Sequence, residues 1–444
     1  MVVVGAARSG VAAAALLARQ GAHVTLSEAR DGFDGADQLQ AKGVHLELGG
    51  HRPDTLAAAD LVVVSPGVPV EQPVFEAARE RGVEIIGELE LASRWLRGRV
   101  IAITGTKGKS TTTTLLGRML EAAGRRVLVG GNIGVPLSTQ VAESTADTLH
   151  VVEASSFQLE TTTTFRPWVA VWLNFADDHL DRHPSIESYA SAKARIFVNQ
   201  TADDWAIVNA DDPVVTERSA GVVANRASFA LSGRIPTGFV VDGEWIVKRT
   251  AAGAERLVPV AAVELTGRHM LNNVLAATAA ASVAGATPRA MTEALRGFRG
   301  LEHVMEPAGE IRGVRFVNDS KATNVEAARR SIESFPRGVA VIIGGRFKGG
   351  DLRLLREPLS VSGRAVVAIG EAAPLVRDAL SGVVPVVEAA SMRDAVARGY
   401  EAAAPDGVVL LAPACASFDW FRDYAERGDS FKEEVKRLQQ TLGR

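Results

Sequence analysis

Glycines, a lysine and several hydroxyl side chains stand close together at residues 105–111, in a spacing suited to binding phosphate. The apolar run Ile101–Ile103 precedes them, and a helical pattern follows. Gly105 and Gly108 let backbone N–H groups curl around phosphate oxygens, and the helix start adds a positive dipole. Lys109 would reach the β- and γ-phosphates of ATP, while the Ser110 hydroxyl would bind Mg²⁺. The predicted ATP-binding residues are Gly105, Thr106, Lys107, Gly108, Lys109, Ser110 and Thr111.

A second candidate for chemistry is Glu153, which directly follows the apolar run Val151–Val152. Ligands of open α/β sheets bind at the carboxyl ends of the strands, and a carboxylate there is a suitable oxygen ligand for Mg²⁺. A glutamate at a strand end is usually just solvated. The pattern alone therefore indicates a metal-binding acid without establishing one.

The elements that must position these residues are short apolar runs, each followed by a helical pattern. The runs lack inside/outside alternation, which is typical of parallel strands covered on both faces. The alternation of strands with helices predicts an α/β protein throughout. The apolar runs are 2–4, 61–64, 100–103, 151–152, 339–343, 366–369 and 408–411.

The length of 444 residues suggests about three domains. Breaks near residues 97–99 and 297–300 give predicted domains 1–97, 98–299 and 300–444. The first and last are expected to be Rossmann-like, and the central one to resemble a phosphate-loop ATPase. The stretch 227–263 predicts a small antiparallel excursion, with a hairpin turn at Asp242-Gly243.

Composition excludes several classes of function. The net charge of −3 gives no global basic field, so we expect no binding to nucleic acid. Cys415 is the single cysteine, which excludes a disulfide framework and suits a reducing compartment. Residues 2–18 have some features of a signal peptide, but a strand, a glycine turn and a helix explain them better. No apolar run approaches the roughly 20 residues that span a bilayer, so we expect no membrane insertion. We also expect a cytoplasmic protein and a monomer.

The segment Gly5–Gly10 offers an alternative function, because it looks like a dinucleotide fingerprint. Glu28 follows near the customary spacing for an acid that binds a ribose. An NAD-type oxidoreductase would use such a pair. The middle glycine is replaced by Ala7, however, which hinders close approach to a pyrophosphate. A glycine turn that only packs a helix, with solvated charges around it, is a further alternative.

The form of the phosphate loop points to a family. Its usual first glycine would fall at Ile103 and is displaced here to Gly105, which resembles the Mur ligase and folylpolyglutamate synthase superfamily. Over essentially its whole length the chain resembles the Mur ligase family, in particular the members that add D-glutamate. The matching segments are 131–134 (Gly-Asn-Ile-Gly), 153–160 (Glu-Ala-Ser-Ser-Phe-Gln-Leu-Glu), 174–182 (Asn-Phe-Ala-Asp-Asp-His-Leu-Asp-Arg), 191–197 (Ser-Ala-Lys-Ala-Arg-Ile-Phe), 318–324 (Asn-Asp-Ser-Lys-Ala-Thr-Asn) and 413–417 (Pro-Ala-Cys-Ala-Ser).

The resemblance implies ATP-dependent amide ligation between UDP-N-acetylmuramoyl-L-alanine and D-glutamate through an acyl phosphate. It implies two Mg²⁺ ions, held by Ser110, Glu153, His179 and Lys193. Lys193 is expected to carry a carbamate, because CO₂ converts a neutral amine into an anion that binds metal, and burial favours the neutral amine. The implied catalytic residues are Lys109, His179 and Lys193.

The resemblance also implies the residues around each substrate. Asn273, Asp319 and Lys321 would join the ATP site. The UDP-substrate residues would be Arg8, Ser9, Glu28, Arg30, Ser65 and Asn132. The D-glutamate residues would be Thr323, Lys348, Ser417 and Tyr424. Local caps, solvated charges and core packing are ordinary alternatives for several of these, and Tyr424 stands where the family commonly has Phe.

Two departures from the family pattern leave alternatives open. Val304 stands where an arginine assists the ATP phosphates, and Met270 stands where the family has asparagine. A lost charged hydrogen bond costs about 1.5–3 kcal/mol. Lys107, which is often Asn in relatives, would compensate by restoring one positive charge at the phosphate loop. The alternatives are a nucleotide-binding homologue with weak or no ligase activity, or a ligase of the superfamily with another amino acid or with folate.

Overall fold

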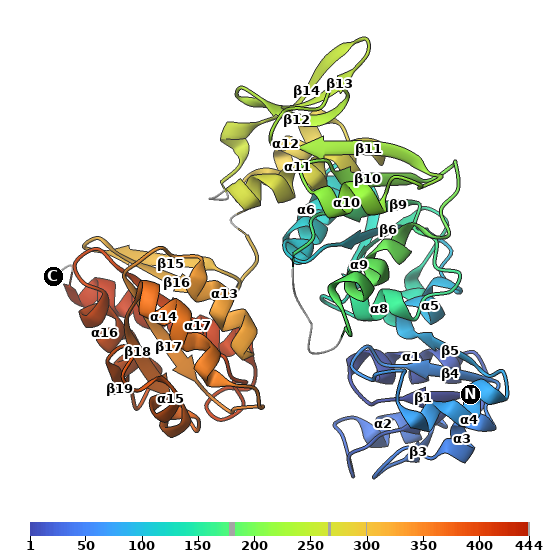
Figure 1. Ribbon diagram of the computed structural model, residues 1–444, viewed down its shortest axis with the longest axis horizontal. Coiled ribbons are helices and arrows are strands. Elements are labelled where there is room, and N and C mark those ends of the chain that lie inside the picture. Colours follow the sequence, from blue (N-terminus) through green and yellow to red (C-terminus); the bar gives the residue numbers. More distant parts are fainter. Residues whose placement is uncertain (177–182, 265–267, 299, 443–444) are drawn as a thin grey trace. The chain divides into compact units, whose positions relative to one another are not determined.

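The computed structural model describes residues 1–176, 183–264, 268–298 and 300–442. Its contacts divide the chain into two compact units, Met1–Phe298 and Arg299–Arg444. Within the described residues the first unit holds two sheets and the second unit holds one (Figure 1). The sheets are mostly parallel and covered by helices, which confirms the predicted α/β class.

The N-terminal sheet has the strand order β3-β2-β1-β4-β5, all parallel. Val3 and Val63 pack against the core on one face, whereas Val2 and Val62 pack against the core on the other. Burial on both faces explains why these strands are continuous apolar runs. The strands are β1 (Val2–Val4), β2 (Thr25–Ser27), β3 (His45–Glu47), β4 (Leu61–Val64) and β5 (Glu84–Gly87), and the helices are α1 (Arg8–Arg19), α2 (Ala36–Gln40), α3 (Pro53–Ala57), α4 (Glu76–Glu80) and α5 (Glu88–Ser93).

The central sheet has the order β14-β13-β12-β11-β10-β9-β6-β8-β7. It is parallel from β7 to β12, and β13 then pairs antiparallel with both β12 and β14. The predicted excursion is therefore present, with its hairpin at Asp242-Gly243, and it continues the same sheet (Figure 1). The strands are β6 (Arg99–Thr104), β7 (Arg126–Gly131), β8 (Thr148–Glu153), β9 (Val169–Trp172), β10 (Trp205–Asn209), β11 (Asn225–Ala230), β12 (Gly238–Asp242), β13 (Trp245–Thr250) and β14 (Gly253–Pro259).

Helices cover both faces of the central sheet. Ile101 and Ile103 of β6 share a core with α6 and α11, while Ala102 belongs to the core on the opposite face. The helices are α6 (Lys109–Ala122), α7 (Leu137–Gln140), α8 (Ser156–Glu160), α9 (Ile186–Ala194), α10 (Pro213–Arg218), α11 (Arg268–Val283) and α12 (Pro288–Leu295).

The second unit has the strand order β15-β16-β20-β17-β18-β19, parallel except for β15. The neighbours β16, β20 and β17 end at the same edge, which brings the loops after them together. The strands are β15 (Glu306–Ile311), β16 (Val314–Asn318), β17 (Val339–Gly344), β18 (Gly363–Ile369), β19 (Val386–Glu388) and β20 (Val408–Leu411), and the helices are α13 (Val325–Glu333), α14 (Arg356–Ser362), α15 (Ala373–Leu380), α16 (Met392–Ala403) and α17 (Tyr424–Leu442).

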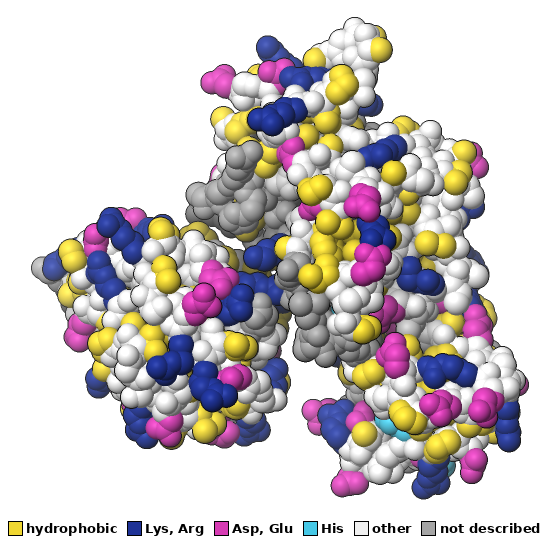
Figure 2. Space-filling view, in the orientation of Figure 1, with side chains coloured by type: hydrophobic (Ala, Val, Ile, Leu, Met, Phe, Trp, Pro, Cys, Tyr) yellow, Lys and Arg dark blue, Asp and Glu magenta, His cyan; other side chains and the backbone are white. Residues whose placement is uncertain are grey.

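Acidic and basic side chains are interspersed on the face that Figure 2 shows, in agreement with the balanced composition. None of the described helices combines the length and the apolar character needed to cross a membrane.

A buried carboxylate joins α5 to the central part of the first unit. The Glu90 side chain is fully buried and accepts hydrogen bonds from the backbone N–H groups of Thr163 (3.0 Å), Thr164 (3.0 Å) and Phe165 (2.8 Å). Arg94 donates to the same carboxylate at 2.9 Å. Burial alone would raise the pKa of Glu90, but a hydrogen bond from the Thr164 hydroxyl, together with those from the backbone N–H groups and Arg94, outweighs it and lowers the pKa to about 2.

Glu90→Gln is expected to lower the free energy of unfolding by about 3 kcal/mol at pH 7. The neutral amide loses the charge that three N–H donors and Arg94 stabilise. Because the folded pKa lies below the ordinary value of 4.5, this contribution is complete above that value and is lost as the pH falls toward 2. In urea unfolding, the difference in the free energy of unfolding between wild type and variant should be smaller by about 1 kcal/mol at pH 4 than at pH 7.

Glu84→Gln is the matched control, because Glu84 pairs with the same Arg94 but its side chain is 45% exposed. It should cost less than about 1 kcal/mol. Equal losses in the two variants, or a gap for Glu90→Gln that does not change with pH, would contradict the role given to Glu90.

Candidate active site

The segment at residues 105–108 has the predicted strand–loop–helix form. β6 ends at Thr104 and α6 begins at Lys109. Gly105 (φ 151°) and Gly108 (φ 82°) both have backbone angles that favour glycine. A Cβ on Gly105 would also lie 3.0 Å from Leu173 Cβ. The loop conformation therefore depends on these two glycines.

Asn174 holds the phosphate loop from outside. The Thr106 N–H donates to both the backbone oxygen and Oδ1 of Asn174, each at 3.1 Å, and the Lys107 N–H donates to the same Oδ1 at 2.9 Å. The Asn174 amide in turn donates to Lys107 O at 3.0 Å. Since the N–H groups of Thr106 and Lys107 are taken, the donors available for phosphate include the first N–H groups of α6.

Two lysines converge on the loop. Lys109 Nζ donates to Gly105 O at 2.9 Å and to Thr106 O at 3.0 Å. Lys193, on α9, is buried, and its Nζ donates to the same Gly105 O at 2.9 Å and lies 4.5 Å from the centroid of the Tyr189 ring. The structure thus places Lys193 at the phosphate loop, which the alternative of a solvated helical lysine does not explain.

The acid Glu153 lies beside the loop because β8 pairs with β6 in the register that sets Glu153 opposite Ile103. Its side chain is buried, and Oε1 accepts a hydrogen bond from Asn132 Nδ2 at 2.7 Å. Oε2 is buried without a hydrogen-bond partner among the described residues. An unpartnered buried carboxylate oxygen is costly unless a ligand satisfies it, and Mg²⁺ accepts such an oxygen.

His179, predicted as a metal ligand, lies outside the described residues. The described chain resumes at His183, which is buried; its Nε2 lies 3.0 Å from Ser156 Oγ and its Nδ1 lies 2.9 Å from Glu160 Oε1. Its ring contacts Phe157 and Tyr189. His183 therefore ties α8 to the helix that carries Lys193. His183 was not predicted as a site residue, although it directly follows the matching segment 174–182.

Asn273 lies against the phosphate loop. α11 packs on α6, and a Cβ added to Gly108 would lie 2.1 Å from Asn273 Oδ1. Asn273 Nδ2 lies 3.7 Å from the Met270 sulfur, so one of the departures from the family pattern helps to orient this side chain. The predicted contact of Asn273 with adenine stays a prediction.

Gly108→Ala is expected to raise KM for ATP by about tenfold to a hundredfold, because the variant combines a left-handed backbone with a clash against Asn273. The double variant Gly108→Ala/Asn273→Ala should regain part of the loss, since the clash disappears and the backbone strain stays. Gly124→Ala separates the two effects: its φ is 74°, but nothing lies within 4 Å of the added Cβ. Initial-rate kinetics should give an unchanged KM for that control; a matching rise there would contradict the clash.

The N-terminal glycine loop is built around Glu28 and Ser65. Glu28 Oε2 accepts from the Ala6 N–H at 2.6 Å, and Oε1 accepts from Arg30 Nε at 2.9 Å. Burial would raise the pKa of Glu28, but the hydrogen bonds from Arg30 and Ala6 lower it to about 2. Ser65 Oγ donates to Gly5 O at 2.9 Å. Glu28 is thus occupied by protein donors, which disfavours the role of a ribose ligand in an oxidoreductase.

Three predicted UDP-site residues differ in their surroundings. Arg8 donates to Gly134 O, in the loop after β7. Ser9 is partly exposed on the first turn of α1, and Asn132 is exposed while its amide holds Glu153. The structure brings Glu28, Arg30 and Ser65 to one glycine loop and connects it through Arg8 to the loop that carries Asn132.

In the second unit, the predicted residues follow neighbouring strands. Asp319 follows β16, is buried, and accepts from Met305 N at 3.1 Å and from Ser331 Oγ; burial raises its pKa. Thr323 and Lys321 are partly exposed, Ser417 is buried, and Lys348 is exposed in the loop after β17. Tyr424 is 38% exposed at the start of α17. The Ala414 N–H donates to Ala322 O at 2.9 Å, which joins two of these loops.

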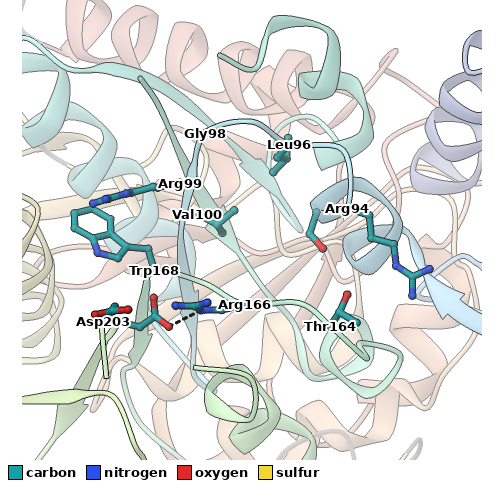
Figure 3. A pocket seen from close by; sticks show the side chains of 11 residues that line it. Arg94, Leu96, Gly98, Arg99, Val100, Thr164, Arg166, Trp168 and Asp203 are labelled. Carbon is teal, nitrogen blue, oxygen red and sulfur yellow. Dashed lines mark hydrogen bonds and ion pairs between the residues drawn. The ribbon is translucent and has the colours of Figure 1, made fainter. Parts of the chain in front are cut away.

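A cavity of about 460 Å³ lies at the amino end of β6, the end opposite the phosphate loop (Figure 3). Arg99 stacks on Trp168 there at 4.6 Å, and Arg166 pairs with Asp204 at 2.7 Å. None of the predicted site residues lines it.

The phosphate loop, with an acid at the end of the neighbouring strand, defines a nucleotide-binding protein of the phosphate-loop class. Family models match residues 1–87 (Mur ligase MurD-like, N-terminal domain), 103–281 (Mur ligase middle domain) and 305–415 (Mur ligase, glutamate ligase domain). The chain belongs to the Mur ligase family. This confirms the resemblance and excludes the oxidoreductase alternative.

Curated relatives cover nearly the whole chain. The UDP-N-acetylmuramoylalanine–D-glutamate ligase of Acidobacterium capsulatum is 46% identical over 440 residues, 98% of this chain and 95% of the relative. The protein of the same name from Desulfosudis oleivorans is 44% identical over 444 residues, 99% of this chain and 96% of the relative. In fold, the chain is similar to a UDP-N-acetylmuramate-alanine ligase from Thermotoga maritima, with a TM-score of 0.56, 19% identity and 99% coverage of both chains.

Proposed function

We propose that this chain is an ATP-dependent ligase that joins D-glutamate to UDP-N-acetylmuramoyl-L-alanine in the synthesis of peptidoglycan precursors. ATP phosphorylates the terminal carboxylate of the L-alanyl arm, and the amine of D-glutamate attacks the acyl phosphate. The tetrahedral intermediate then releases phosphate and leaves the amide. The observation that carries the proposal is the buried Glu153 oxygen, which has no hydrogen-bond partner in the described part of the chain and lies beside the loop where Lys109 and Lys193 converge.

The chemical difficulty is the approach of a carboxylate to a polyanionic nucleotide. Lys109 supplies a cation at the loop, and the first N–H groups of α6 supply fixed donors that need no reorganisation during the reaction. Asn132 keeps the Glu153 carboxylate in one orientation. Two Mg²⁺ ions, held by Ser110, Glu153, His179 and the Lys193 carbamate, would neutralise the remaining charge.

The substrate assignments belong to the same proposal. Arg8, Ser9, Glu28, Arg30, Ser65 and Asn132 would surround the UDP substrate. Thr323, Lys348, Ser417 and Tyr424 would hold D-glutamate, while Asn273, Asp319 and Lys321 would contact ATP. The meeting of the loops after β16, β20 and β17 at one sheet edge supports a common site for the amino acid.

We also propose the domain limits 1–97, 98–299 and 300–444, a monomer, and a location in the cytoplasm, where the buried thiol of Cys415 stays reduced.

The deciding experiment is coupled ADP release with UDP-N-acetylmuramoyl-L-alanine and a panel of D-glutamate, L-glutamate, L-lysine and meso-diaminopimelate. Release stimulated by D-glutamate alone, with product of the expected mass, is the expected result. Stimulation by another amino acid would reassign the substrate. ADP release no higher with both substrates than without them would favour a nucleotide-binding homologue.

A further inference from the structure

The second unit contains an arginine that is almost completely buried. Arg427, on α17, is 1% exposed. Its Nε donates to Ser320 Oγ at 3.0 Å, its Nη2 donates to Ser320 O at 2.9 Å, and its Nη1 donates to Cys415 O at 3.1 Å. One guanidinium thus connects the loop after β16 to the loop after β20.

The acceptors around Arg427 are a hydroxyl and two carbonyl oxygens, and none is a carboxylate. Within the part of the chain that the structure describes, no acid forms an ion pair with Arg427. Burial lowers its pKa to about 10, against the smaller opposing effect of the Asp419 charge, which makes no hydrogen bond to the guanidinium. A buried charge without a counter-ion is costly to a fold. Such a charge becomes favourable when an anionic ligand binds near it.

The loops that Arg427 joins are those that carry the residues proposed for D-glutamate. Ser320 lies three residues before Thr323, and Cys415 lies two residues before Ser417. Ser320 Oγ also donates to Tyr424 O at 2.8 Å, which adds the start of α17 to the same network. Ala416 and Arg346 exchange backbone hydrogen bonds of 2.9 and 3.0 Å, which attach the loop of Lys348.

The packing leaves little room for these loops to move independently. A Cβ on Gly345 would lie 2.2 Å from Ala416 O and 3.2 Å from Arg427 Nη1. The guanidinium therefore lies close to the backbones of the loops after β16, β17 and β20. Its position depends on this tight packing of the three loops.

We propose that Arg427 is a positioning residue for the amino-acid substrate: it fixes the loops of Thr323 and Ser417 relative to each other and supplies a buried positive charge that favours a dicarboxylic amino acid. The inference rests on the proposed function. The buried charge of Arg427 would favour a substrate with two negative charges, and this effect would add to that of the side chains that contact the substrate.

The test is the change in the three KM values in Arg427→Lys and Arg427→Met, measured by ADP release in the full-length protein. Lysine keeps the charge, but its compact ammonium group cannot reproduce the planar geometry by which the guanidinium reaches both loops, so KM for D-glutamate should rise about tenfold. Methionine removes the charge as well and should raise it by about a hundredfold. KM for ATP and for the UDP substrate should stay within about twofold in both variants, because the charge acts on the amino-acid site.

Arg437→Met is the matched control: Arg437 lies on the same helix, is 56% exposed and pairs with Glu434 at 2.9 Å. It should leave all three KM values unchanged. Ser320→Ala removes one acceptor of Arg427 and keeps the charge, so it should raise KM for D-glutamate a few-fold. This variant tests the role of Arg427 if Arg427→Met does not fold.

Equal changes in all three KM values, or a loss of thermal stability with an unchanged KM for D-glutamate, would overturn the role of Arg427 while the ligase activity stands. A wild-type protein that releases no ADP with D-glutamate would overturn the proposed function and this inference with it.

Discussion

Lys109→Met is expected to lower kcat/KM for ligation by about a thousandfold. The variant removes the cation at the phosphate loop but leaves its frame, because Gly105 O keeps the hydrogen bond from Lys193 and Asn174 still holds Thr106 and Lys107. ADP release at saturating D-glutamate measures the effect, and an unchanged thermal melting temperature would show that the fold is intact.

Lys107→Met is the informative comparison, since only Gly108 separates Lys107 from Lys109. Lys107 is exposed, and only its backbone is held by Asn174. If Lys107 supplies the positive charge that is missing because Val304 replaces an arginine, then Lys107→Met should raise KM for ATP by no more than about tenfold. A large gain of ATP affinity in Val304→Arg, together with no loss in Lys107→Ala, would reject compensation. Equal defects in Lys107→Met and Lys109→Met would contradict the special role of Lys109.

The strands that were predicted from the sequence are covered on both faces, although β9 (Val169–Trp172), which is equally buried, was not among them. Each predicted apolar run lies within a strand, from β1 at Val2–Val4 to β20 at Val408–Leu411. The edge strands β3 and β19 were not predicted, because exposed residues interrupt them. A strand with one open side has no continuous apolar run by which to recognise it.

The phosphate loop could be predicted because its chemistry is contained in consecutive residues. The side chains that hold it could not, because they are distant in sequence. The order β9-β6-β8 brings Asn174 to one side of the loop and Glu153 to the other. Asn273 reaches Gly108 from a helix that starts more than 150 residues later. Such neighbours follow from strand order and helix packing, which local spacing does not encode.

Family resemblance assigned roles to residues, whereas the structure shows what holds those residues in place. The resemblance gave Ser417 and Thr323 to D-glutamate, but it gave no role to Arg427, which connects their loops. A lone arginine in an amphipathic helix is normally a solvated side chain, so no sequence signal distinguishes Arg427 from Arg437. Only burial and the acceptors around the guanidinium separate the two.

Glu153→Gln is expected to reduce kcat by about a hundredfold to a thousandfold and to raise the Mg²⁺ concentration needed for half-maximal rate. The variant keeps the shape of the side chain and an oxygen for Asn132 Nδ2, but it replaces the unpartnered carboxylate oxygen with a neutral group that attracts a cation far less. Asn132→Ala keeps the charge and only frees the carboxylate, so its defect should be about tenfold. ADP release across a Mg²⁺ titration separates the variants. Equal Mg²⁺ dependence in wild type and Glu153→Gln would mean that the buried oxygen binds no metal.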